Sequence, residues 1–160
     1  MLRPALIAAL LLSAALPVAA QNVAFGGMTA DTSAPVEMSA DNLSVNQADG
    51  SAVFSGNVII AQGEMKLSAT EVTVIYAEGG QQRIQSLRAT GGVTLVSGPD
   101  AAEAREAVYQ VGSGIIDLSG DVVLTQGQNV LTGDTMQVSL ADGTAQVQGR
   151  VRTILQPGGN

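Results

Sequence analysis

The strongest constraint on this chain is an internal repeat made of short β-strand patterns. Four signatures recur, and the most distinct is a Gly-x-Val tripeptide. Its glycine occupies four positions spaced 35, 29 and 29 residues apart, at Gly56, Gly91, Gly120 and Gly149. A second signature, which starts at residues 39, 68, 103 and 132, is spaced 29, 35 and 29. One six-residue insertion between residues 79 and 91 explains both series, so we interpret the repeat as real.

The other two signatures predict turns. Polar turns that contain glycine fall at residues 48–50, 78–80, 112–114 and 141–143, and shorter turns fall at Gln62-Gly63, Ser97-Gly98 and Gln126-Gly127. Many β-branched residues between glycine turns are typical of strands. Each repeat therefore predicts two strands joined by turns. The segment AAEAREAV, which could be read as helical, takes a strand register in this scheme.

The side chains alternate within each predicted strand, and the alternation changes phase once per repeat. Phe54, Val58 and Ile60 share one face. The phase changes near residues 40–41 and 69–71, where a β-bulge or corner would re-aim the strand. Repeated corners bend a sheet round on itself. We therefore predict an all-β fold, a twisted open sheet of antiparallel strands built from four repeats of 29 to 35 residues.

The first 20 residues have the pattern of a secretory signal peptide. A positive Arg3 precedes an apolar run from Ala5 to Leu16, and a small-residue cleavage site ends at Ala20. The run is shorter than the roughly 20 residues needed to cross a bilayer, and a retained membrane anchor is the alternative. We expect a soluble exported protein made of a flexible segment, a folded domain and a flexible tail, at residues 21–33, 34–155 and 156–160.

The composition excludes several kinds of site. The chain has no His and no Cys, which removes the usual zinc sites, Ser-His-Asp triads, Cys nucleophiles and disulfides. Without Arg3, six basic and 14 acidic side chains leave a formal charge of −8. This charge argues against nucleic acid as a partner, because that binding depends on Lys and Arg. We expect no metal and no cofactor.

A carboxylate pair is the remaining catalytic possibility. Four acidic residues recur near the predicted corners, at Asp41, Glu71, Glu106 and Asp134. Their recurrence in every repeat favours a structural role, in which they hydrogen-bond the corner backbone. We therefore predict that the chain is not an enzyme, with an exported polysaccharide-acting enzyme as a minor alternative.

The segment FSGNVIIAQGEMKLSATEV, residues 54–72, resembles the core motif of the LptA/OstA family of periplasmic lipopolysaccharide-transport proteins. The resemblance extends from about Thr32 to Leu155. Gly92 and Arg150 stand where the first Gly-x-Val copy has Asn, and the charge is acidic rather than balanced. The features that match are Gly56-Asn57-Val58, Gln62-Gly63, Lys66, Ala69 and the preceding segment Pro35 to Asp41.

This resemblance implies a V-shaped β-jellyroll, open at both ends, with an apolar groove for the acyl chains of lipid A. It implies a periplasmic carrier that passes lipopolysaccharide from the inner to the outer membrane. It also implies end-to-end assembly with further copies and with the jellyroll domains of LptC and LptD. The physical reason for an apolar groove is that each buried CH₂ group is worth about 0.8 kcal/mol.

The groove residues follow from the resemblance and from the alternation. The family's groove positions align with Thr32, Val36, Met38, Leu95 and Val111. Further inward-facing positions are expected at Phe54, Val58, Ile60, Met65, Leu67, Val72, Val74 and Leu124.

We expect the first and last strands to be open edges that pair with other molecules. The residues that mark these edges are Val36, Met38, Val147, Val151 and Leu155. The basic side chains are expected either to be solvated or to contact lipid A phosphates. They are Lys66, Arg83, Arg88, Arg105, Arg150 and Arg152.

A different functional class remains open, an exported β-solenoid scaffold or filament protein that holds no ligand. Solenoid rungs would lack the phase-changing corner and the Gln-Gly hairpin turns. Capture of lipopolysaccharide at inward but not outward positions would separate the two hypotheses.

Overall fold

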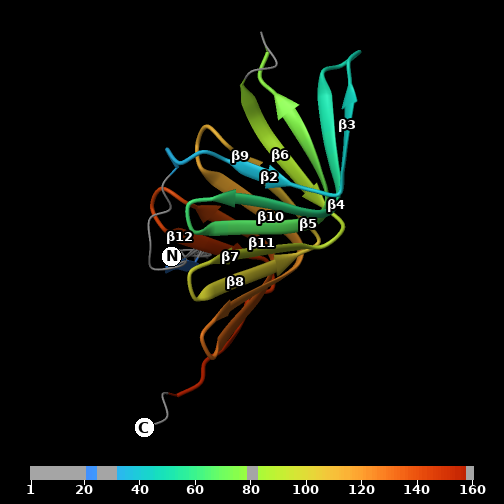
Figure 1. The fold of residues 1–160 in the computed structure, drawn as a ribbon. Helices are drawn as coiled ribbons and strands as arrows, with labels where there is room; N and C mark the ends of the chain where they lie inside the picture. The colour runs from blue at the N-terminus through green and yellow to red at the C-terminus, as the bar shows by residue number, and fades with distance from the viewer. Residues whose placement is uncertain (1–20, 25–31, 79–82, 158–160) are drawn as a thin grey trace, which may run out of the picture.

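The computed structural model describes residues 21–24, 32–78 and 83–157, and the predicted signal peptide lies outside them. All regular elements in these segments are β-strands (Figure 1). In chain order they are β1 Gln21–Ala24, β2 Glu37–Ser39, β3 Asn42–Asn46, β4 Ser51–Gln62, β5 Met65–Tyr76, β6 Ile84–Thr90, β7 Val93–Ser97, β8 Asp100–Ala104, β9 Glu106–Gln110, β10 Ile115–Gln126, β11 Asn129–Ser139, β12 Thr144–Gln148 and β13 Arg152–Ile154.

The strands form two layers that share four long strands, β4, β5, β10 and β11 (Figure 1). The lower layer contains β2, β7, β8 and β13 together with one half of each long strand. The upper layer contains β3, β6, β9, β12 and β1 with the other halves. The two halves of β4 and β5 run in different directions, like the arms of a V. Every pairing is antiparallel, which confirms the predicted jellyroll and does not fit a solenoid of parallel rungs.

The corners between the layers are β-bulges. In β4 the register shifts between Ser55 and Val58, and β10 has the equivalent shift. Gly56 and Asn57, within the shift, have φ angles of 80° and 46°. Two successive left-handed residues bend the strand and change which face the following side chains occupy. The phase change predicted from the sequence is therefore a real corner.

A side chain from the neighbouring segment of chain covers each corner glycine. A Cβ atom added to Gly91, for example, would lie 2.6 Å from Thr70 Cβ, so only glycine fits. The covering side chain occupies the same place in each repeat, which makes the motif fourfold. The four pairs are Asp41 over Gly56, Thr70 over Gly91, Arg105 over Gly120 and Asp134 over Gly149.

Two of the four predicted corner acids, Asp41 and Asp134, lie at corners. Their carboxylates accept hydrogen bonds from the side chains of Asn57 and Arg150 and not, as predicted, from the corner backbone. The main-chain N–H groups of Asp41 and Asp134 each donate to a corner glycine carbonyl over 2.9 Å. In the middle repeats the corner position belongs instead to Thr70 and Arg105. The prediction chose the next residue along because it searched for acids, whereas the corner requires only a side chain that can cover the glycine.

Tight hairpin turns close the lower layer. Gly63, Gly98 and Gly127 have φ angles of 58°, 57° and 61°. Only two residues separate paired positions, as with Gln62 and Met65. Glycine first in a two-residue loop is typical of a type II′ turn, whose twist matches that of the flanking strands. These predicted turns are confirmed.

One apolar cluster lies between the layers and forms the core. On β5 the inward side chains of Met65, Leu67, Val72 and Val74 are at most 1% exposed, and Ala69 is 8% exposed. The interval from Leu67 to Val72 breaks the two-residue period, and the corner in between keeps both pairs facing inward.

The two ends of the sheet differ in how their edges are used. Within the described residues β2 and β3 each pair only with β4, and β13 pairs only with β11. Of the predicted edge residues, Met38 lies in β2 and Val36 directly precedes that strand. Val151 and Leu155 flank β13. Val147 differs from our expectation, because its strand β12 lies between β11 and β1 and has no open edge.

Residues 21–24, expected to be part of a flexible segment, form strand β1. Gln21 is the register partner of Val147, and Ala24 is that of Thr144. Strand pairing uses main-chain N–H and C=O groups, which every sequence carries. The alternation of side chains therefore gave no signal for this strand.

Candidate functional site

The predicted groove residues lie in or against the cluster between the two layers. Thr32 alone is exposed, and its carbonyl oxygen accepts a hydrogen bond from Gln62 Nε2 over 3.1 Å. Four residues are partly buried against the cluster, namely Val36, Met38, Phe54 and Val111. The buried ones are Val58, Ile60, Met65, Leu67, Val72, Val74, Leu95 and Leu124. Their role in holding a lipid stays a prediction.

The middle of this interior is closed by its own side chains. Leu95 on β7 of the lower layer and Ile116 on β10 of the upper layer both have 0% exposure. Side chains without contact to water leave no free path between the layers at this level. An elongated guest can reach Leu95 only if the layers move apart.

The N-terminal end of the interior is open. Leu43 and Val45 on β3 are 56% and 58% exposed. Their register partners Phe54 and Ala52 belong to the inner face, and directly opposite residues of a pair share a face. Leu43 and Val45 therefore extend the apolar inner face beyond the closed middle. Alternation gives the face on which a side chain lies but not what covers it, so the exposure of Leu43 and Val45 has no signal in the sequence.

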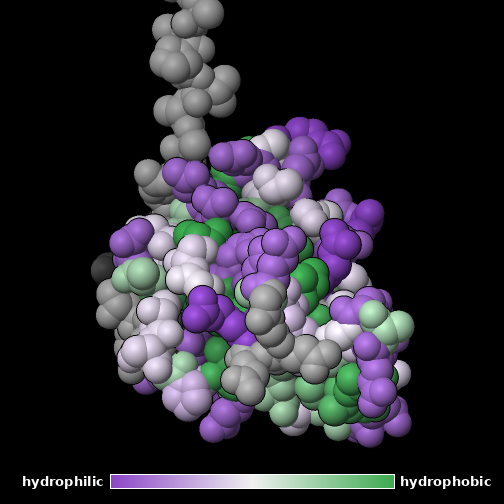
Figure 2. Space-filling view, turned by 90° about the horizontal axis from the view of Figure 1, so that it is seen from above, coloured by the Kyte–Doolittle hydropathy of each residue, from purple (hydrophilic) through white to green (hydrophobic). Residues whose placement is uncertain are grey.

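Seen from above, hydrophobic side chains reach the surface in patches between hydrophilic ones (Figure 2). Such exposed apolar surface is typical of interaction sites when it is contiguous. Leu43 and Val45 form such a pair on adjacent inward positions of one strand.

A polar contact joins the two layers on the side away from the corners. The Tyr109 hydroxyl, on β9 of the upper layer, donates to Gln62 Oε1 at the end of β4 in the lower layer. Gln62 Nε2 also donates to the carbonyl of Ala34 over 2.9 Å. Tyr109 and Gln62 are 1% and 2% exposed. We call Tyr109, Gln62 and the main chain of residues 32–34 the clasp, a contact that the sequence did not predict.

The clasp changes the chemistry of its tyrosine. Burial raises the pKa of Tyr109 above its ordinary value, and the hydrogen bond with Gln62 opposes this in part. The hydroxyl therefore stays protonated and can donate throughout the physiological range. A signal existed in the sequence, since Gln62 follows Ile60 in the inward series and a buried amide requires partners.

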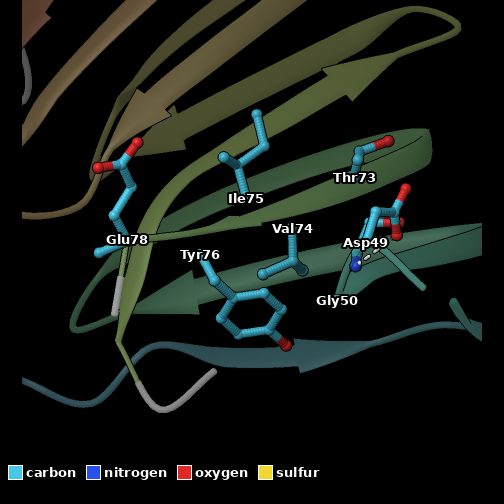
Figure 3. A pocket seen from close by; sticks show the side chains of 9 residues that line it. Asp49, Gly50, Thr73, Val74, Ile75, Tyr76 and Glu78 are labelled. Carbon is cyan, nitrogen blue, oxygen red and sulfur yellow. Dashed lines mark hydrogen bonds between the residues drawn. The ribbon is translucent and has the colours of Figure 1, made fainter. Parts of the chain in front are cut away.

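A shallow hollow of about 390 Å³ lies at the tips of β4 and β5 (Figure 3). Val74 and Tyr76 point to one side of β5 there, and Thr73 and Ile75 point to the other. At its rim Ser51 donates two hydrogen bonds to Asp49, and they lower the pKa of that carboxyl. The hollow is too open to enclose a small molecule, but Tyr76 borders the same apolar face as Val74.

The basic residues lie on the outside. Arg150 binds Asp134 over 2.8 Å, and this hydrogen-bonded ion pair raises the pKa of Arg150. Arg105 forms an ion pair with Asp121 at the previous corner. Two of the six candidate phosphate ligands are therefore already paired with a carboxylate at a corner. The remaining four are exposed, namely Lys66, Arg83, Arg88 and Arg152.

The corner carboxylates do not converge on a cleft. Asp41 accepts from Asn57 Nδ2 over 2.9 Å, and Asp134 is paired with Arg150. Glu71 and Glu106 alternate with inward residues and are exposed. This arrangement gives the catalytic alternative no carboxylate pair among these four residues.

Two further features are absent from the described segments. These segments contain no group of three or more His, Cys, Asp or Glu side chains that could hold a metal ion. No helix within residues 21–24, 32–78 or 83–157 has the length and apolar character to span a membrane.

Solved structures include a similar fold. LptH from Pseudomonas aeruginosa, described as the LptA-homologous periplasmic component of the lipopolysaccharide transport device, aligns with a TM-score of 0.68 and 19% sequence identity. The alignment covers 80% of this chain and 99% of LptH. At this identity the likeness concerns the fold.

Sequence relatives cover nearly the whole chain. An uncharacterised protein of Rhizobium meliloti is 31% identical over 94% of this chain and 86% of its own length. The lipopolysaccharide export system protein LptA of Escherichia coli K12 is 26% identical over 94% of this chain and 83% of its own length. A family model described as LptA/(LptD N-terminal domain) LPS transport protein matches residues 37–144. With two thirds of its length inside that model and an antiparallel jellyroll to match, the chain belongs to the LptA/LptD N-terminal domain family of LPS transport proteins.

Proposed function

We propose that this protein acts in the periplasm as a carrier of lipopolysaccharide, with the lipid A acyl chains held between the two layers. The proposal is supported by membership of a transport family and by relatives that are named for lipopolysaccharide export. The observation that carries the acyl-chain site is the uncovered inner face at Leu43 and Val45. The proposed role is transport, without a chemical change in the lipid.

Leu43 and Val45 provide an apolar surface on which the acyl chains can begin to bind. Acyl chains lose contact with water there without any change in the rest of the fold, at about 0.8 kcal/mol for each buried CH₂. Deeper binding needs the layers to separate, because Leu95 is fully buried. The long strands join the layers at the corners, and the clasp holds the other side. Opening of the clasp with the corners as hinge would admit the chains.

The head group of the lipid would stay outside the interior. Its phosphates are negatively charged, and the buried side chains of the described residues are apolar or uncharged apart from one acid, Asp100, which is 7% exposed. The exposed cations Lys66 and Arg88 lie on the outer faces of β5 and β6. They remain candidates for phosphate contacts.

The acyl-chain site is tested by photo-crosslinking with a matched control. A benzophenone amino acid replaces Leu43 in one variant and the adjacent Ser44 in another, which alternates to the outer face of the same strand. We expect labelled lipopolysaccharide to be captured at position 43 and not at position 44. A third probe at Leu95 reports whether the closed middle opens. Equal capture at 43 and 44 would contradict the site.

We further propose that the protein joins end to end with copies of itself and with LptC-like and LptD-like jellyrolls at the inner and outer membranes. The open edges of β2 and β3 at one end and of β13 at the other support this. The cellular test is complementation: after depletion of the cell's own LptA, expression of this chain should restore lipopolysaccharide at the outer membrane. Failure to restore it, with normal export of the chain, would contradict the carrier role.

A ligand-free filament protein is the second candidate, and the closed middle of the interior favours it. Leu95, Ile116 and Leu124 have 0% exposure, as in an ordinary packed core. This candidate predicts filaments that form without lipopolysaccharide and no capture at position 43 or 95.

A further inference from the structure

We propose that residues 21–24 are an exchangeable internal cap on β12, which a strand of a second copy must displace before the two copies can join. The proposal concerns how assembly is controlled. It rests on the end-to-end assembly proposed above but does not depend on the lipid site. Its basis is the strand pairing at the C-terminal end of the sheet.

The two ends of the molecule match in length and direction. The N-terminal end presents β2, of three residues, and then β3, of five. The C-terminal end presents β12, of five residues, and then β13, of three. A corner separates the two strands at each end, at Asp41 and at Arg150, and each corner has the same hydrogen bond to a glycine carbonyl.

This match defines which strands would pair. The chain runs from the lower to the upper layer through β2 and β3, and from the upper to the lower layer through β12 and β13. Stacked end to end, β3 of one copy would lie antiparallel to β12 of the next, and β2 would lie antiparallel to β13. Both pairings continue the antiparallel order within each copy. A strand added to an open edge gains main-chain hydrogen bonds in this way.

β1 occupies the position that β3 of a second copy needs. It pairs antiparallel with four of the five residues of β12, from Thr144 to Val147. An edge strand presents one row of N–H and C=O groups, and two strands cannot use that row together. β13 has no such cover among the described residues, so β2 of the second copy can make a first, transient contact there, and stable joining requires that β3 then displaces β1. The cap thus protects the edge in the monomer and is exchanged on assembly.

The cap is tested by locking it in place. Asn22 and Gln146 are register partners, and partners in an antiparallel pair lie at a separation that a disulfide can bridge. The chain has no other cysteine, so the double variant Asn22→Cys with Gln146→Cys can form only this bond within one molecule. The protein used is the chain from residue 21 to residue 160. Sedimentation velocity over a range of concentrations measures the association.

We expect the oxidised clamp to stay monomeric at concentrations where the reduced form of the same protein associates. A chain that lacks residues 21–24 should reach half-association at roughly tenfold lower concentration than the unaltered chain. That factor corresponds to a cap that leaves about one molecule in ten open. Circular dichroism of the truncated chain verifies that the sheet is retained.

Three results would overturn the cap. The first is equal association of the oxidised and reduced clamp. The second is an unchanged midpoint after truncation, including a truncated chain that stays monomeric. The third is failure of the two cysteines to form an intramolecular disulfide under an oxidant, since β1 would then not lie on β12. Crosslinking of lipopolysaccharide to the monomer at position 43 is independent, so a failed cap and a failed carrier give different results.

Discussion

At the scale of single residues, the clasp is the feature most sensitive to substitution. In Tyr109→Phe the ring is kept and the hydroxyl is lost, so Gln62 Oε1 loses the donor it has in the fold. We expect the free energy of unfolding at neutral pH to fall by about 1–3 kcal/mol, the usual effect of a buried polar atom without its partner. Urea unfolding followed by circular dichroism measures it. Tyr76→Phe, at the other tyrosine, is the control and should change stability less.

The same residue predicts a dependence of stability on alkaline pH. Burial raises the pKa of Tyr109 in the fold above the ordinary value of 10.0. The folded state therefore binds more protons than the unfolded state between those two pKa values. Stability is fully present below pH 10 and falls as the pH rises through the folded pKa. Unfolding measured between pH 8 and about 11 should show this loss in the unaltered chain and a smaller loss in Tyr109→Phe.

The corner glycines allow a matched comparison at one site. Gly91 and Gly92 both have positive φ, at 83° and 87°. A Cβ atom at Gly91 would meet Thr70, whereas one at Gly92 meets nothing within 4 Å. Gly92→Ala should cost only the left-handed strain, about 1–2 kcal/mol. Gly91→Ala should cost clearly more because Thr70 must also move, and equal losses in thermal or urea unfolding would contradict the covering role.

At the scale of strands, much of the fold could be predicted because side-chain alternation encodes it. The phase change from Leu67 to Val72 located a corner, and the glycine turns located the hairpins. The corner residues of the middle repeats were predicted one position late, since Thr70 and Arg105 are chemically unlike Asp41. From the sequence, the corner positions could be identified only by residue type. In the fold, any side chain that can lie over the corner glycine can occupy such a position.

The site was predictable only where it depends on alternation. Inward residues such as Val58 and Ile60 follow from the two-residue period. The clasp does not, because Tyr109 and Gln62 are 47 residues apart and their contact depends on how far the layers are folded together. β1 could not be predicted from the side-chain pattern either, because its main-chain hydrogen bonds do not depend on side-chain type.

The ion pairs at the corners contribute little to the stability of the strands they join. Arg105 and Asp121 have side chains that are 75% and 72% exposed, and such pairs usually contribute 0–1 kcal/mol. We expect Arg105→Asp combined with Asp121→Arg to be within about 0.5 kcal/mol of the unaltered protein. Each single variant should be less stable than the double variant at low salt and similar to it at high salt. A large loss in the double variant would mean that the long Arg105 stem over Gly120 matters more than the charge.

At the scale of the whole molecule, the proposed carrier role predicts that lipopolysaccharide binding depends on the exposed inner face at Leu43 and Val45 rather than on overall stability. In Leu43→Asp a charge enters the uncovered inner face, and acyl chains would have to bind beside it. We expect several-fold weaker capture of lipopolysaccharide by a probe at Val45. The melting temperature should change little, because Leu43 is 56% exposed. Ser44→Asp, on the outer face of the same strand, should leave capture unchanged. An equal loss of lipopolysaccharide capture in the two variants would contradict a binding role for the exposed inner face of β3.

The unequal ends of the sheet have a consequence for any assembly of this protein. In the end-to-end assembly proposed above, a β2–β3 end pairs with a β12–β13 end, and such a contact between two different surfaces does not close about a twofold axis. An assembly of this kind is head-to-tail and has a defined polarity along its length. The repeat itself sets no number of copies. Such an assembly would therefore end at a partner that carries only one of the two kinds of end.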